Sequence, residues 1–202
     1  DRSGRVQPTG APAQAYVLPR ISPSGTRVAV TTDDGVDRAA WTYDWERNTL
    51  SRLTLDTPGQ NPVWSPDGTR IAFESLKPGA APFVIKTVDG SGAEVSVDAP
   101  GDGASLQSWS PDGRTLVYQV TGPSSDRDLW TISIDGKRTA APLIQTRFFE
   151  GGGTVSPDGR YVAWVSVETG TNQVYVQAYP GGGGKVQVST VGGIEPVWAK
   201  SG

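Results

Sequence analysis

Short segments in which apolar and polar residues alternate recur along the whole chain. One of them, RIAFES (Arg70–Ser75), is followed by FVIKT (Phe83–Thr87), and equivalent pairs occur near residues 27–44, 115–133 and 161–178. These runs are rich in β-branched and aromatic residues and are bounded by Gly, Pro, Asp or Ser, which is typical of half-buried strands separated by turns. No segment shows the helical spacing of apolar residues. The pattern therefore predicts an all-β fold.

The alternating segments belong to a repeat built around a Ser-Pro-Asp-Gly motif. The motif occurs in ISPSGTRVAV, WSPDGTRIAF, WSPDGRTLVY and VSPDGRYVAW, which begin at Ile21, Trp64, Trp109 and Val155. A fifth copy, WAKSG, begins at Trp198. The Ser positions are 22, 65, 110 and 156, and Ala199 takes the fifth place, so the repeat is 43 to 46 residues long. A repeat of about 40–45 residues made of short strands indicates a β-propeller with four antiparallel strands in each blade.

The phase of the repeat predicts where the blades begin and end. Four complete blades are expected over residues 16–56, 57–98, 99–146 and 147–190. Residues 1–15 are expected to form the outer strand of a preceding blade, and residues 191–202 the inner strand of a following one. We interpret residues 1–202 as a single partial propeller domain, and the Asp at position 1 in place of an initiator Met favours this. The blade edges of an open ring lack partner strands, which would allow self-association.

The Ser-Pro-Asp-Gly motif is suited to a tight turn. Pro favours the first central position of a type I turn, Asp accepts hydrogen bonds from nearby backbone N–H groups, and Gly tolerates the positive φ at the exit. The alternative is that the Asp residues bind a metal ion or act as acid and base. However, Asp67, Asp112 and Asp158 belong to separate blades and cannot meet in one site. Trp64 and Trp109, which precede the motif, are expected to pack between neighbouring blades.

The composition excludes several classes of site. The chain has no Cys, His or Met, so disulfides, thiolate or imidazole metal sites and Ser-His or Cys-His catalytic pairs cannot form within it. We expect no metal ion and no cofactor. The net charge is -3, with acidic and basic residues interspersed, which argues against a nucleic-acid partner. No apolar run approaches the roughly 20 residues of a membrane span, so no membrane contact is expected for this segment.

Candidate binding residues come from the loops that differ between repeats. In a propeller, the loops between second and third strands and those between a fourth strand and the next first strand share one end of the ring, around the channel mouth. We expect a partner or ligand to bind there. The candidates are Asp33, Asp34, Asp102, Arg127, Arg147, Phe148, Phe149 and Glu150. The same loops contain Gln60, Asn61, Lys77 and Asp126.

Two of these loops have competing interpretations. TTDDGVD (residues 31–37) is acidic, but it lacks the alternating spacing and terminal Glu of a calcium loop, so a solvated loop is favoured over a cation site. In RFFEGGG (Arg147–Gly153), we expect one Phe to fill a blade interface and the other to cover the channel; the alternative is that one faces solvent or a partner. Glu150 and Asp102 form a candidate carboxylate pair for glycoside hydrolysis, but no other feature supports that chemistry.

Three aromatic residues alternate on the expected third strand of the first blade, namely Trp41, Tyr43 and Trp45. Such a stripe is usually packed between blades, and this interpretation is favoured. An exposed aromatic ladder that binds a sugar or a partner is the alternative.

The repeated WSPDGTRIAF resembles the WD-like repeat of TolB-type β-propellers. The second half of the chain, from GGGTVSPDGRYVAW to IEPVWAKSG, and the opening DRSGRVQPTGAPAQAYVLPRISPSGTRVAV are similar to the C-terminal propeller of bacterial serine/threonine protein kinases. This resemblance implies a ring of six blades or a similar number, an extracytoplasmic location in a bacterium, and a role in binding a protein or small ligand. The signature motifs of the kinase itself are absent from this sequence.

The favoured hypothesis is a non-catalytic recognition or scaffold module that binds a protein, peptide or small ligand at the channel-mouth loops. The resemblance would make it the sensor part of a bacterial receptor kinase or a TolB-like envelope protein. The alternative is the propeller domain of an enzyme, either a peptidase gating domain or a carbohydrate-active lyase or hydrolase, whose catalytic residues lie outside this chain.

Overall fold

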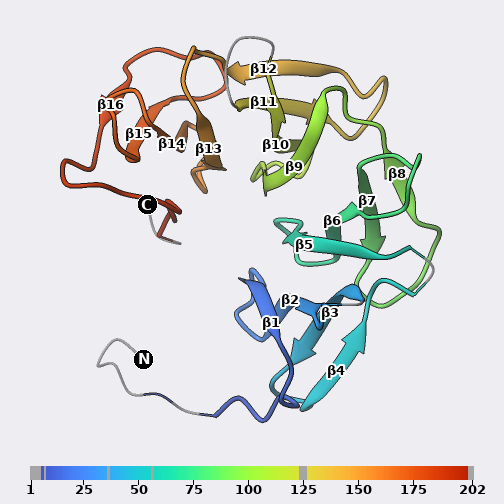
Figure 1. The fold of residues 1–202 in the computed structure, drawn as a ribbon. Coiled ribbons are helices and arrows are strands. Elements are labelled where there is room, and N and C mark those ends of the chain that lie inside the picture. Colours follow the sequence, from blue (N-terminus) through green and yellow to red (C-terminus); the bar gives the residue numbers. More distant parts are fainter. Residues whose placement is uncertain (1–5, 7, 36, 56, 123–126, 200–202) are drawn as a thin grey trace.

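Four antiparallel sheets of four strands each are arranged around a ring (Figure 1). The structure, a computed structural model, describes residues 6, 8–35, 37–55, 57–122 and 127–199. The first two blades contain β1 (Tyr16–Ile21), β2 (Arg27–Asp33), β3 (Arg38–Asp44), β4 (Thr49–Arg52), β5 (Gly59–Trp64), β6 (Arg70–Ser75), β7 (Phe83–Thr87) and β8 (Val95–Val97). The third and fourth blades contain β9 (Asp102–Trp109), β10 (Thr115–Thr121), β11 (Asp128–Ser133), β12 (Ala140–Ile144), β13 (Glu150–Val155), β14 (Tyr161–Ser166), β15 (Gln173–Ala178) and β16 (Val186–Gln187).

Within each blade the strands follow the order of the chain, from the innermost first strand to the outermost fourth strand. This arrangement confirms the predicted all-β propeller architecture. The pairing register shifts part-way along each inner strand, for example between Gln60 and Val63 on β5. Asn61 lies in that bulge with a φ of 51°. Because bulges re-aim side chains, the Asn61 amide reaches the third blade, where its Nδ2 donates to Leu106 O at 2.6 Å.

The Ser-Pro-Asp-Gly segments form the turns between the first and second strands of the blades. In the second blade, Ser65 Oγ and Thr69 N donate to Asp67 Oδ1 at 2.5 and 3.0 Å. The same bond from Ser to Asp occurs at Asp112 and Asp158, at 2.6 Å in both turns. This hydroxyl bond is the main cause that lowers the pKa of each Asp carboxyl from its ordinary value. The turn interpretation is confirmed, because each carboxylate is bonded within its own turn.

The apolar core lies between neighbouring blades. Phe83 and Ile85 of the second blade pack in one cluster with Leu116 and Tyr118 of the third. The rings of Phe83 and Tyr118 meet edge to face, with centroids 5.5 Å apart. A further cluster joins the third and fourth blades through Val117, Leu129, Val162, Trp164 and Tyr175. Alternate residues of a second strand therefore face opposite neighbours, so these strands are buried on both faces and are not half-buried as the sequence pattern predicted.

Tryptophans at the end of the inner strands link adjacent blades. Trp64 Nε1 donates to Arg20 O at 2.8 Å, and Trp198 Nε1 donates to Thr154 O at 3.0 Å, with a chain separation of 44 residues in both cases. Trp198 therefore takes the position on the fourth blade that Trp64 takes on the first. The described residues 8–15 and 191–199 contain no strand, and the assignment of the two terminal segments to further blades stays a prediction.

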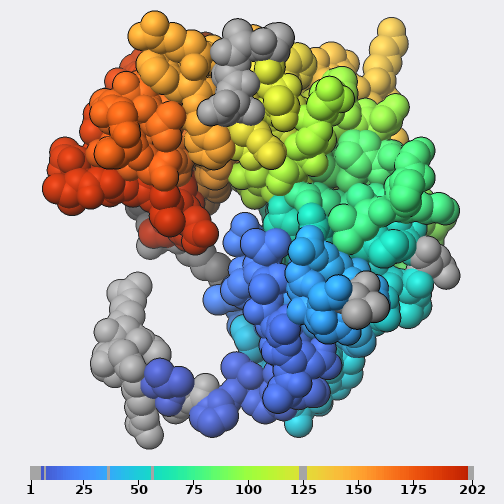
Figure 2. Space-filling view, viewed as in Figure 1, coloured from blue at the N-terminus to red at the C-terminus, as the bar shows by residue number. Residues whose placement is uncertain are grey.

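One side of the ring is open, between the first blade, blue in Figure 2, and the C-terminal segment, red in the same view. The stripe of Trp41, Tyr43 and Trp45 lies on the face of the first blade that borders this opening. Trp41 and Trp45 are half-buried, and no other described blade packs over the stripe. Tyr43 is covered instead by the preceding segment, since its hydroxyl donates to Thr9 O at 2.6 Å. None of the described residues belongs to a helix long and apolar enough to cross a membrane.

Candidate binding site at the channel mouth

The blade topology brings the candidate residues to one end of the ring. All of them lie in or beside connections between second and third strands, or between a fourth strand and the next first strand. They fall into two groups, which the second blade separates. The first group is in the first blade, and the second is on the third and fourth blades. Asp126, which the sequence also places here, is outside the described residues.

The acidic loop of the first blade is partly neutralised by arginines. Arg38 Nε donates to Asp33 Oδ2 at 2.8 Å, and Arg52 Nη2 donates to Asp37 Oδ2 at 2.8 Å. Asp34 Oδ1 accepts a bond from the Asp37 amide at 2.8 Å. The three carboxylates line a cavity of about 360 Å³ on the open side of the ring. Within the described part of the chain, no group of three or more acidic side chains is placed to hold a metal ion.

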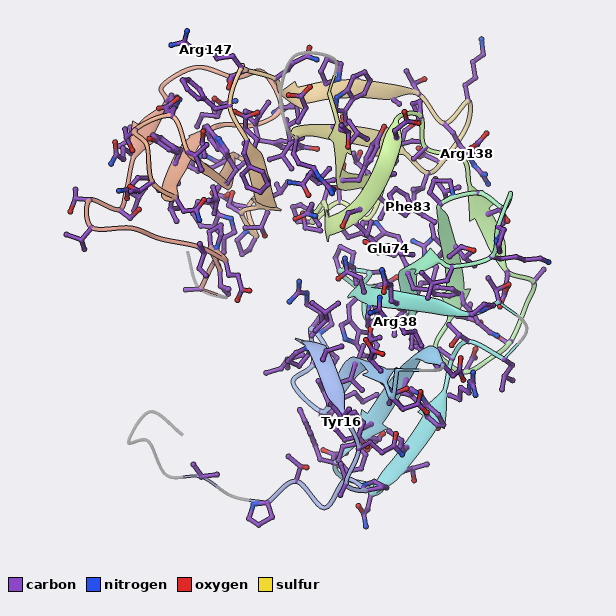
Figure 3. The ribbon with its side chains drawn as sticks, in the orientation of Figure 1. Tyr16, Arg38, Glu74, Phe83, Arg138 and Arg147 are labelled. Carbon is purple, nitrogen blue, oxygen red and sulfur yellow. The ribbon has the colours of Figure 1, made fainter. Side chains whose placement is uncertain are left out.

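A polar network connects this loop to the interior of the second blade. Arg38 Nη1 donates to Gln60 Oε1 at 3.0 Å, and Gln60 Nε2 donates to Glu74 Oε2 at 2.9 Å. Glu74 lies on β6, and only 8% of it is exposed. Figure 3 shows Arg38 and Glu74 on either side of β5. The network therefore leads from the exposed loop at the mouth to a buried carboxylate.

Glu74 also joins the second blade to the third. Its Oε1 accepts bonds from Asn61 Nδ2, Ser105 Oγ and Leu106 N, each at 2.8 Å. Together with Gln60, these groups provide donors for both carboxylate oxygens. A buried carboxylate is tolerated when its lone pairs are satisfied in this way, so Glu74 acts as a fixed link between the blades.

The residues equivalent to Glu74 in the neighbouring blades make similar links. Thr31 Oγ1 accepts a bond from the backbone N–H of Asn61 at 3.0 Å, and Gln119 Nε2 donates to Glu150 O at 2.6 Å. Thr31, Glu74 and Gln119 are 43 and 45 residues apart, which is the length of the repeat. Sequence reasoning missed them, although a polar residue recurring in a strand that is otherwise buried was an available signal.

Arg127 and Phe149 both lie next to the Gln119 side chain, where the third and fourth blades meet. Arg127 Nη1 lies 3.5 Å from Gln119 Oε1. A side chain at Gly151 would lie 2.9 Å from both Gln119 Nε2 and the Phe149 ring, so the ring packs against β13 beside Gln119. Both Arg127 and Phe149 are half-buried. The structure therefore combines a cation, an amide and an aromatic ring at this part of the mouth.

The remaining candidates have different surroundings. Asp102 is exposed at the start of β9, next to Gly103, whose carbonyl accepts a bond from Arg127 at 3.3 Å. Arg147 is exposed, and its side chain points away from the centre of the ring in Figure 3. Its guanidinium lies 4.9 Å from the centre of the Phe148 ring. Arg147 therefore contributes to the outer surface, contrary to the expectation that it lies near the channel mouth, and the half-buried Phe148 ring lies against its guanidinium.

Glu150 lies inside a blade junction and not on the surface. Its side chain is 0% exposed, and Thr146 donates to its Oε1. Burial raises the pKa of the Glu150 carboxyl to about 7 and the charge of Asp128 adds to this, whereas the Thr146 bond and the charge of Lys185 oppose it. The sequence-based expectation is corrected in two respects: Glu150 is not accessible to a partner, and its neighbouring carboxylate is Asp128 and not Asp102.

Comparison with known proteins identifies the family. The family model described as TolB beta propeller domain matches residues 56–202. The chain belongs to this family. This TolB-type propeller is 31% identical over 130 residues to a protein named "Protein TolB homolog" from Chlorobaculum tepidum, covering 64% of the chain and 28% of that protein. It is 29% identical over 161 residues to "Tricorn protease homolog 1" from Streptomyces coelicolor, covering 76% of the chain and 15% of that protein.

A solved structure shows the same fold. The putative TolB from Agrobacterium tumefaciens superimposes on this TolB-type propeller with a TM-score of 0.70 and 19% identity, over 88% of this chain and 67% of that chain. The curated relatives are much longer than the region they share with this chain, which covers 28% and 15% of the two described above. Their activities as whole proteins therefore do not transfer directly.

Proposed function

We propose that this TolB-type propeller is a recognition module that binds a protein or peptide at the channel mouth. The observation that carries the proposal is the group formed by Arg127, Gln119 and Phe149. The Arg127 guanidinium can bind the carbonyl and carboxylate groups of a peptide, and the Phe149 ring adds apolar contact area. Gln119 is buried and its Nε2 is bonded to Glu150 O, so its role is to position Arg127 through Oε1. Gln119 lies on β10, and Arg127 and Phe149 directly precede β11 and β13, which favours a preformed site.

The match to the TolB beta propeller domain supports the same proposal, because the resemblance to TolB-type propellers implies a role in binding a protein or small ligand. We propose that the partner is a protein or peptide and that the location is extracytoplasmic. The location and the role as the sensor part of a receptor kinase rest on the resemblance described above. Sequence flanking these 202 residues would test both, because a kinase domain and a membrane segment upstream are required by the sensor role.

The relative named as a tricorn protease homolog favours a second hypothesis. In that case the propeller is a non-catalytic domain of a peptidase, and the same mouth admits or orients peptide substrates. The chain contains no His, so a Ser-His-Asp triad cannot be completed by its own residues. A peptidase domain in the flanking sequence would support this hypothesis over the sensor role.

A selection from a displayed peptide library tests the binding site without a known partner. Peptides enriched on the wild-type protein are measured against Phe149→Ala and Arg127→Ala, and against Arg114→Ala as a control. Arg114 is exposed at the opposite end of the third blade, beside the Ser-Pro-Asp-Gly turn. We expect at least tenfold weaker binding for the two mouth variants, equivalent to about 1.4 kcal/mol, and unchanged binding for the control. Equal affinities for all three variants would contradict the site.

A further inference from the structure

Glu150 differs from the other buried glutamate, Glu74, in its hydrogen bonding. Its side chain is 0% exposed at the junction of the third and fourth blades. Oε1 accepts a bond from Thr146 Oγ1, but no hydrogen-bond donor among the described residues reaches Oε2. A buried, ionised carboxylate with an unsatisfied oxygen is costly. The neutral, protonated form of Glu150 is therefore the one that suits this position.

The position of Glu150 connects it to the groups at the channel mouth. Its amide donates to Arg127 O at 2.8 Å, and its carbonyl accepts from Gln119 Nε2 at 2.6 Å. Thr146, which binds the carboxyl, also accepts a bond from the Phe148 amide at 3.1 Å. The carboxyl is thus bonded to the connection between β12 and β13, and the backbone of the same residue is bonded to Arg127, directly before β11.

The charges around Glu150 are not balanced in favour of its ionised form. Asp128, on β11, is 1% exposed, and its Oδ2 accepts from Gln145 Nε2 at 3.0 Å. Lys185, between β15 and β16, is the cation that acts on Glu150, but it is paired with Glu168. Among the described residues, one ammonium group therefore faces the carboxyls of Glu150, Asp128 and Glu168. No arginine guanidinium is bonded to Glu150 in the described structure.

We propose that Glu150 is a pH-sensitive switch: protonated, it holds the 145–149 connection and the start of β11 against the fourth blade, and ionised, it loosens them. The loosening follows because a charged carboxylate in this position must attract water or move toward it. Partner binding at the mouth should then be stronger below neutral pH and weaker above it, a consequence that rests on the proposed function. The switch itself is a property of the unbound protein and is tested without a partner.

The direction of the effect follows from burial. The pKa of the Glu150 carboxyl is raised from 4.5 to about 7, so the folded protein holds this proton more tightly than the unfolded chain does. The stabilisation from protonated Glu150 is fully present below about pH 4.5 and is lost as the pH rises through about 7. The loss of this stabilisation thus falls at pH values near neutrality.

Carbon-13 NMR of the glutamate side-chain carboxyls tests the titration directly. We expect one carboxyl resonance of the wild-type protein to titrate near pH 7 and to be absent in Glu150→Gln. Glu74→Gln is the matched control, because it removes another buried glutamate and should leave that resonance in place. If every glutamate carboxyl of the wild-type protein titrates below pH 6, the proposal is wrong.

Hydrogen exchange tests the structural consequence in the wild-type protein alone. After correction for the intrinsic effect of pH on exchange, protection of the Glu150 and Phe148 amides should fall by up to about tenfold between pH 7 and pH 8. The Leu106 amide, bonded to Glu74 at 2.8 Å, should keep its protection. In Glu150→Gln the two amides should no longer respond to pH. Equal pH responses of all three wild-type amides would overturn the switch, even if the variants failed to fold.

Discussion

The junction between the second and third blades and the junction between the third and fourth blades each bury a glutamate, but their hydrogen bonding differs. Glu74 has four donors, from Gln60, Asn61, Ser105 and Leu106, and both of its oxygens are used. Glu150 accepts one side-chain bond, from Thr146, and its second oxygen has no described donor. Both residues are buried, with 8% of Glu74 and 0% of Glu150 exposed, and their hydrogen-bond donors differ most.

This difference shows that burial alone does not determine the role of an acidic residue in a propeller. Where donors converge, the hydrogen-bonded carboxyl group links the two blades. Where they do not, desolvation favours the neutral form and makes the junction sensitive to pH. The repeated fold provides equivalent places at each junction, and the side chains of adjacent blades decide which outcome occurs.

Removing the Glu74 carboxylate should have the largest effect on stability. Glu74→Ala leaves the Leu106 amide and the Asn61 and Gln60 amide groups with fewer acceptors in a buried region. Because each buried unsatisfied group costs about 1–3 kcal/mol, we expect the free energy of unfolding to fall by about 2–4 kcal/mol. Denaturant unfolding at pH 7 measures this change.

A matched control for that experiment is Glu46→Ala, in the exposed turn between β3 and β4. An exposed glutamate away from buried networks should change the unfolding free energy by no more than about 0.5 kcal/mol. A loss of less than about 1 kcal/mol in Glu74→Ala would show that the four hydrogen bonds do not stabilise the junction as the structure implies.

The fold could be predicted from the sequence because the turn motif recurs with nearly constant spacing, and each turn is stabilised by local bonds such as that of Ser65 to Asp67. The position of the candidate residues at one end of the ring follows from the same topology. The burial of Glu150 could not be predicted in this way. It depends on where the fold places Asp128, on β11 of the third blade, and Lys185, in the connection between β15 and β16. Arg147, three residues before Glu150 in the chain, is exposed.

Trp64 and Trp109 offer a second comparison between blade junctions, in which one indole N–H is hydrogen-bonded and the other is not. Trp64 Nε1 has a partner on the neighbouring blade, Arg20 O, at 2.8 Å. Trp64→Phe removes this bond and leaves the carbonyl without its donor, so it should lower the unfolding free energy by about 1 kcal/mol more than the same change at Trp109. Thermal or denaturant unfolding of the two variants in parallel measures the difference. Identical losses would show that the Trp64 bond adds nothing beyond ring packing.

Trp109→Phe should have the smallest effect of these changes. Trp109 Nε1 is buried and has no described hydrogen-bond partner, so the substitution removes an unsatisfied donor while it also reduces the volume of the side chain. The loss of packing and the relief of the unsatisfied group oppose each other. The Arg70 guanidinium lies 5.0 Å from the centre of the Trp109 ring, and Phe retains a weaker form of that contact. We expect a net change of about 0.5 kcal/mol or less in the free energy of unfolding. A loss as large as that of Trp64→Phe would mean that packing, and not hydrogen-bond satisfaction, controls the stability of these blade junctions.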